Sequence, residues 1–132
     1  DDSINLCSIL SDEGIDFIHL SCWNAFKESI SYKNDSKTLT EWFVTSLNNL
    51  PPVISTGKVW SHKDAQHLLN QGADLIGVGR AAIGHPDWAR QVKNINYDPT
   101  KPPFSVNQLK EAMLSDVFID YMRNWEGFVC EK

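Results

Sequence analysis

The 132-residue sequence lacks several features that would indicate particular classes of protein. No apolar run approaches the roughly 18 residues that a membrane span requires, and the first residues do not resemble a signal peptide. With 12 basic and 17 acidic residues, the chain carries a formal charge of −5. Nonspecific nucleic-acid binding depends on basic patches, so this charge argues against it. We therefore expect neither a membrane nor a nucleic acid among its partners.

Cysteine is also scarce. The three cysteines, Cys7, Cys22 and Cys130, are odd in number and have no metal-type spacing, so we expect reduced thiols and a cytoplasmic location. His62 and His67 lie five positions apart, the wrong spacing for a shared metal, and we expect both to be solvated and the chain to hold no metal. The hydrophobic fraction of 42% and charged fraction of 22% are ordinary for a globular domain.

The most informative stretch is residues 52–90, which places two apolar strands on either side of one helix. We expect strands at residues 53–56 and 75–78, each leading into a glycine and then a basic residue. The residues that follow the strands are Gly57, Lys58, Gly79 and Arg80. Glycine lets an anion approach backbone N–H groups, and an arginine adds a bidentate charged donor. Parallel strands joined by a helix end at the same edge of a sheet, so this pattern predicts a phosphate site.

Each of these residues also has a simpler interpretation. Gly57 alone could be a tight exit from a strand, and only the backbone N–H of Lys58 is implied in the site. Arg80 could instead form an ion pair with Asp74 or Asp87. We favour phosphate binding because both glycines occur at this spacing.

Three motifs of this region resemble those of a known family. They are PVISTG at residues 52–57, GADLIGVGR at 72–80, and a helix expected to open at Pro86-Asp87. Residues 14–21, GIDFIHLS, resemble a further strand. Together they resemble the C-terminal part of the old yellow enzyme family, the FMN-dependent NAD(P)H oxidoreductases built on a (β/α)8 barrel. One departure is Thr56-Gly57, where many members carry Gly-Gly.

The resemblance implies an α/β fold, with strands six to eight of a TIM barrel in residues 1–93 and a connector and helices in 94–132. It implies that Gly57, Lys58, Gly79 and Arg80 hold the phosphate of FMN, with NADH or NADPH as reductant and an activated alkene or related acceptor as substrate. A barrel needs about 250 residues, so we expect this chain to be a fragment that is inactive alone. No catalytic residue is assigned.

Two other interpretations stay open. Another phosphate-binding barrel enzyme would share the two-glycine site, and a three-stranded remnant could be a non-catalytic folding or assembly unit. A three-stranded fragment of a barrel leaves two sheet edges open, which predicts a homo-oligomer.

Further elements follow from local signals. We expect helices from Ser3, as a cap, to Gly14, from Thr38 to about residue 48, from Ser61 to Gly72, from 105 to about 114, and from 116 to about 125. In the second and third of these helices we expect one apolar face, formed by Leu39, Trp42, Phe43 and Leu47, and packing of Ala65, Leu68 and Leu69 on the sheet. In the last two we expect a capping box of Ser105 with Gln108, and Val117, Ile119, Tyr121, Met122 and Trp125 available for packing. Residues 22–37 form the long loop, where Cys22, Trp23 and Phe26 could line a substrate side or simply pack. His19 could approach a ligand, but a hydrogen-bonded structural role is favoured. Arg123 beside Trp125 resembles, more weakly, residues of one branch of the family that reach a neighbouring subunit.

Overall fold

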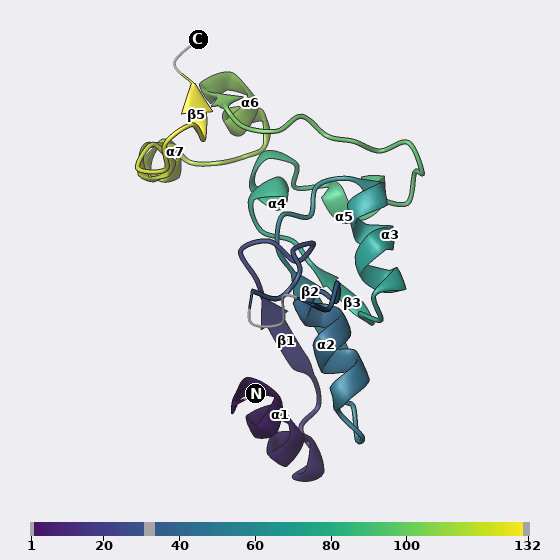
Figure 1. The fold of residues 1–132 in the computed structure, drawn as a ribbon. Coiled ribbons are helices and arrows are strands. Elements are labelled where there is room, and N and C mark those ends of the chain that lie inside the picture. Colours follow the sequence, from purple (N-terminus) through teal and green to yellow (C-terminus); the bar gives the residue numbers. More distant parts are fainter. Residues whose placement is uncertain (1, 31–33, 131–132) are drawn as a thin grey trace. The chain divides into compact units, whose positions relative to one another are not determined.

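A computed structural model describes residues 2–30 and 34–130, which form an α/β structure (Figure 1). The chain divides into two compact units, and each is described by itself. One unit comprises Asp1–Val59 and Lys63–Val78, and the other comprises Trp60–His62 and Gly79–Lys132.

The first unit contains α1 (Asp2–Asp12), β1 (Ile18–Ser21), α2 (Leu39–Ser46), β2 (Val53–Thr56), most of α3 (His62–Asn70) and β3 (Leu75–Gly77). The second contains α4 (Arg80–Gly84), α5 (Trp88–Gln91), β4 (Phe104–Ser105), α6 (Val106–Glu111), α7 (Asp116–Met122) and β5 (Val129–Cys130). No helix of the described residues is long and apolar enough to cross a membrane.

The sheet of the first unit is parallel, with strand order β1-β2-β3. Strand β2 has the predicted bounds, and β3 ends one residue earlier than expected. The pairs Ser21↔Thr56 and Thr56↔Gly77 bring the carboxyl ends of all three strands to one edge. The α/β class with parallel strands is confirmed, and the described residues form an open sheet rather than a closed barrel.

One face of this sheet carries the core of the first unit. Ile18, Leu20 and Val53 are buried there together with Phe43 and Leu47 of the α2 region. Figure 1 shows α2 running alongside β1 and β2, and partly buried residues of α1 complete the cluster. The alternate residues of β1, including His19, are exposed. This difference between the faces follows from the two-residue period of a strand.

Helix α2 begins where the sequence predicts. The Thr38 hydroxyl accepts a hydrogen bond from the Glu41 N–H, and the Glu41 carboxylate accepts one from the Thr38 N–H, completing a capping box. The helix ends at Ser46, two residues before the expected end, and Leu39 faces solvent instead of the core. Helix α1 begins at Asp2, so the expected role of Ser3 as its cap is wrong.

Helix α3 begins directly after Ser61 and is followed by Gly72, whose φ of 98° turns the chain into β3. Ala65 and Leu68 are buried as expected. Leu69 was expected to pack on the sheet but is 42% exposed, because it lies beside the buried stripe of the helix rather than on it.

The start of the second unit differs from the sequence prediction. Residues 80–84 form the short helix α4, which was not expected, and the next helix, α5, begins at Trp88 with Asp87 as its N-cap rather than at Pro86. Trp88 is buried and its indole N–H donates a hydrogen bond to the Trp60 carbonyl over 2.6 Å.

The core of the second unit surrounds Phe104, which is fully buried. The rings of His85 and Phe128 approach it edge-on, with centroids 5.7 and 5.3 Å away. A Cβ at Gly84 would lie 2.5 Å from the Phe104 ring, so this contact requires glycine. Phe104 belongs to β4, which pairs in parallel with β5, and neither strand was predicted.

Residues 94–103 form no helix or strand, and the two expected closing helices are present, with earlier ends than expected. Ser105 caps α6 by accepting from the Gln108 N–H, but the Gln108 amide donates to Thr100 instead of completing a capping box. In α7, Ile119 and Met122 are buried. Val117, Tyr121 and Trp125, which were expected to be available for packing, are exposed.

Candidate functional site

Gly57 and Lys58 form a tight exit from β2 in the first unit, with φ values of 151° and 57°. A Cβ at Gly57 would lie 2.5 Å from the Cys22 carbonyl oxygen and 2.8 Å from the Ala25 nitrogen. Two backbone hydrogen bonds hold these segments together. The Cys22 N–H donates to the Thr56 carbonyl, and the Ala25 N–H donates to the Gly57 carbonyl. Gly57 is therefore required by its packing against residues 22–25, whatever else it does.

Gly79 and Arg80 lie in the second unit, so the structure describes this pair separately from Gly57 and Lys58. Gly79 is the N-cap of α4 and Arg80 is its first residue, and both are exposed. A Cβ at Gly79 would meet nothing within 4 Å, and no side chain caps the helix there. Internal packing therefore does not explain this glycine, and its backbone is open to approach.

Three neighbouring strands meet at the side chain of Thr56. His19 Nε2 of β1 lies 2.8 Å from Thr56 Oγ1 of β2. A Cβ at Gly77 of β3 would lie only 1.7 Å from the same oxygen. His19 is hydrogen-bonded, as the favoured interpretation expects. The contact between Thr56 and Gly77 was not foreseen, although a glycine inside an apolar strand signals a close approach of this kind.

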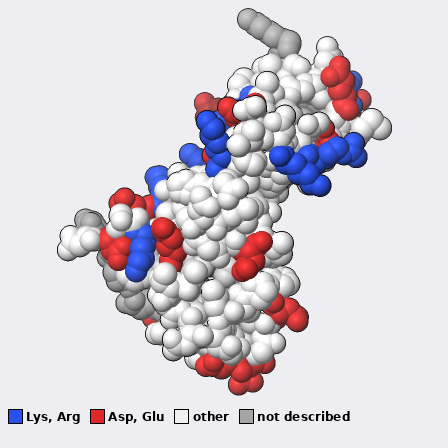
Figure 2. Space-filling view, turned by 90° about the vertical axis from the view of Figure 1, so that its right-hand side faces the viewer, with Lys and Arg blue, Asp and Glu red and all other residues white. Residues whose placement is uncertain are grey.

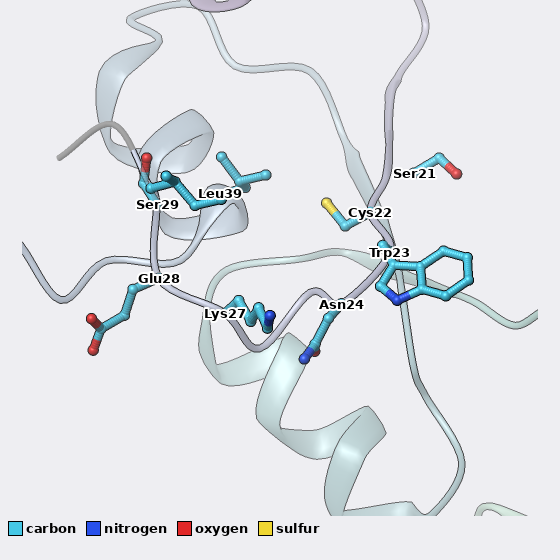
Figure 3. Close-up of a pocket in the computed structure, with 9 residues that line it drawn as sticks. Ser21, Cys22, Trp23, Asn24, Lys27, Glu28, Ser29 and Leu39 are labelled. Carbon is cyan, nitrogen blue, oxygen red and sulfur yellow. The ribbon is translucent and has the colours of Figure 1, made fainter. Parts of the chain in front are cut away.

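A pocket of about 530 Å³ opens beside the carboxyl end of β1, within the usual size range of small-molecule sites (Figure 3). It is lined by Ser21, Cys22, Trp23, Asn24, Lys27, Glu28, Ser29, Ile30 and Leu39. Cys22 and Trp23 thus line a pocket, whereas the Phe26 ring packs edge-on against His67 at 5.4 Å. Packing is therefore the outcome for Phe26, and a substrate role for Cys22 and Trp23 stays a prediction.

Cys22 supplies a thiol to the lining of this pocket. Burial raises the pKa of the Cys22 thiol above its ordinary value, which keeps it protonated and poorly nucleophilic near neutral pH. Figure 3 shows its sulfur on the side of Ser29 and Leu39, with Lys27 and Glu28 supplying charge of both signs.

Charge is unevenly distributed in the first unit. Asp2, Asp12, Glu13 and Asp16 precede its first basic residue, Lys27. Figure 2 shows acidic side chains gathered around the α1 end of this unit. An anionic ligand would be repelled there.

Other residues singled out from the sequence have structural partners. The Asp74 carboxylate accepts from the Val53 N–H over 2.8 Å and so joins β2 to the start of β3. His62 is half-buried, with Nδ1 2.7 Å from the Val92 carbonyl, so the expectation that it is solvated is wrong. Arg123 forms an ion pair with Asp120. Among residues 2–30 and 34–130, no group of three or more His, Cys, Asp or Glu side chains could hold a metal.

The chain is 35% identical over 95 residues to the NADH:fumarate oxidoreductase of Klebsiella pneumoniae (strain 342), a match that covers 70% of this chain. It is 29% identical over 116 residues to the NADH:acrylate oxidoreductase of Vibrio harveyi, over 86% of this chain. It is 24% identical over 92 residues to the "Probable NADH-dependent flavin oxidoreductase YqiG" of Bacillus subtilis (strain 168), over 70% of this chain. The predicted resemblance to the old yellow enzyme family is confirmed.

The names of all three relatives give an oxidoreductase that uses NADH, and one of the names includes a flavin. The matched segments cover 10%, 11% and 25% of their lengths, so the chain spans only a small part of each. No protein-family model matches the chain.

Proposed function

We propose that this chain supplies the phosphate-binding end of an FMN site in an NADH-dependent flavin oxidoreductase. Gly57, Lys58, Gly79 and Arg80 would hold the phosphate. The observation that carries this proposal is the pairing of Thr56 with Gly77, which makes the ends of β2 and β3 neighbours. Gly57 and Lys58 directly follow Thr56, and Gly79 and Arg80 follow Gly77 within three residues. The names of the relatives support a flavin and NADH.

The residues present fit such a group. The phosphate of FMN is an anion that backbone N–H groups and a guanidinium can bind together. Gly79 has open space where a side chain would stand, and Arg80 is exposed beside it. When bound there, FMN would supply the chemistry of hydride transfer between NADH and an acceptor. The role of these residues is to anchor the cofactor and to balance its negative charge.

We further propose that residues 1–93 correspond to strands six to eight of a (β/α)8 barrel and that 94–132 form a C-terminal connector with helices. The chain would then be one segment of a longer polypeptide, as its small share of each relative supports. Flavin-ring and proton-donor positions would lie on other strands, so the segment alone is inactive. The two glycines would also be consistent with another phosphate-binding barrel enzyme, but the names of the relatives favour an oxidoreductase.

Two relatives are named for fumarate and acrylate, which are both activated alkenes. We therefore propose an activated alkene as the acceptor of the longer protein, in agreement with the family resemblance. Cys7 and Cys22 are free thiols, which supports a reducing, cytoplasmic location.

The test is to replace Arg80 with alanine in the full-length gene product that contains these residues and to measure FMN binding by quenching of flavin fluorescence. A charge-assisted hydrogen bond contributes roughly 1.5–3 kcal/mol, so FMN affinity should fall about tenfold to a hundredfold. Riboflavin, which lacks the phosphate, should bind the variant and the parent equally. Arg90→Ala, which removes another exposed arginine of the same unit, serves as the matched control. Unchanged FMN binding by Arg80→Ala would refute the phosphate assignment.

A further inference from the structure

The uncovered face of the first unit's sheet holds a hydrogen-bonded pair at the strand ends. His19 of β1 and Thr56 of β2 face the same side, and His19 Nε2 lies 2.8 Å from Thr56 Oγ1. This bond joins two residues that are 37 positions apart in the sequence. Neither residue belongs to the apolar cluster on the opposite face, so the core does not account for the pair.

Gly77 fixes the position of the Thr56 hydroxyl from the other side. The oxygen occupies the place where any larger residue at position 77 would put its Cβ. The Thr56 hydroxyl is thus held between β1 and β3, at the last residue of β2. A side chain held on both sides loses little further freedom when it binds a ligand.

The backbone that follows Thr56 is fixed as well. The Thr56 and Gly57 carbonyls accept hydrogen bonds from the N–H groups of Cys22 and Ala25. The hydroxyl therefore stands one residue before the proposed phosphate-binding pair, on a backbone segment that residues 22–25 hold in place.

The direction of the hydrogen bond decides what the hydroxyl can do. A threonine hydroxyl has one proton to donate and two lone pairs that accept. If the His19 Nε2–H donates to Oγ1, the threonine proton is left to donate elsewhere. If Nε2 instead accepts that proton, only lone pairs remain, and these repel an anion. An anionic ligand at the strand ends therefore selects the form in which His19 donates.

We propose that His19 is a positioning residue that donates to Thr56 Oγ1 and so directs the Thr56 hydroxyl proton to the phosphate of FMN. This inference rests on the proposed function, because it adds a side-chain donor to the same phosphate site. Thr56 is the residue that touches the phosphate, and His19 acts through it.

The test measures the dissociation constants of FMN and riboflavin for variants of the full-length gene product. Thr56→Val keeps the side-chain shape without the hydroxyl and should weaken FMN binding about tenfold, since a hydrogen bond to a charged group is lost. Thr56→Ser should bind FMN like the parent. His19→Leu should weaken FMN binding about threefold, and His19→Gln, which keeps a donor, should restore it. Riboflavin affinity should be unchanged throughout.

The double variant His19→Leu with Thr56→Val separates a positioning role from an independent one. It should bind FMN as Thr56→Val does, because His19 has no route to the ligand once the hydroxyl is gone. Additive losses would overturn the proposed route. Equal losses of FMN and riboflavin affinity would show a structural role and overturn the inference.

The outcome for Arg80→Ala distinguishes the two proposals. If the Arg80→Ala variant loses FMN affinity while the His19 and Thr56 variants bind FMN like the parent, the inference about His19 and Thr56 fails and the proposed function stands. If Arg80→Ala binds FMN like the parent, or the parent binds no flavin, the proposed function fails and the inference fails with it.

Discussion

Gly57→Ala and Gly79→Ala should have opposite consequences, although both glycines follow strands. A Cβ at Gly57 would press on two backbone atoms, the Cys22 carbonyl oxygen at 2.5 Å and the Ala25 nitrogen at 2.8 Å, which cannot rotate away. Its φ of 151° is also one that side-chain-bearing residues rarely adopt. At Gly79 the added Cβ would meet nothing within 4 Å.

The magnitude for Gly57 follows from these two costs. An unfavourable backbone conformation costs about 1–3 kcal/mol, and overpacking adds about 1–3 kcal/mol, so we expect a loss of about 2–6 kcal/mol. That is a large part of the roughly 5–15 kcal/mol by which domains are stable. Gly79→Ala should change the free energy of unfolding by less than about 0.5 kcal/mol, as substitutions at open surface sites do. It should nevertheless weaken FMN binding by keeping the phosphate from the backbone.

The assay is denaturant unfolding of the full-length gene product, followed by circular dichroism, with FMN binding measured on the same preparations. Gly57→Ala should lower the unfolding midpoint and Gly79→Ala should leave it in place. If the Gly57→Ala variant unfolds at the same denaturant concentration as the parent, the packing argument is refuted. A Gly79→Ala variant with the parent's FMN affinity would count against an open approach to its backbone.

Three further predictions concern one buried amide and the behaviour of the isolated chain. Gln71 is 6% exposed, and its amide atoms have no hydrogen-bond partner among the described residues, so Gln71→Leu should stabilise the protein by about 1–2 kcal/mol in denaturant unfolding. A loss of stability would instead reveal a partner for this amide. The 132-residue chain purified alone should be colourless and should not oxidise NADH; stoichiometric FMN or turnover above background would contradict this. Phe17 and Leu75 expose 53% and 55% of their surface, and burying such a side chain contributes about 1.5–3 kcal/mol, so the isolated chain should self-associate. Light scattering that shows a monomer at high protein concentration would overturn that expectation.

Much of the fold was predictable because its signals are local. The Thr38 capping box depends on residues three positions apart, and β2 is signalled by a short, mostly β-branched segment, Val-Ile-Ser-Thr, between Pro52 and Gly57. Helix ends were less predictable, because unwinding the last turn of a helix costs little free energy and contacts with distant residues decide where the helix stops. Helix α4 was missed, since Gly79 is a weak N-terminal signal and the helix has only five residues. The strands β4 and β5 are two residues each, too short to show a period.

The sequence by itself determined the alternation of strands and helices, the two glycine-basic pairs and the family resemblance, because propensity, capping and motif spacing act within a few residues. Only the tertiary structure decided which glycine is required by packing and which is open. It also brought His19 to Thr56 and Thr56 against Gly77, which requires the register of three strands. Register depends on the side chains that a sheet face can bury together, and that is a property of the whole unit.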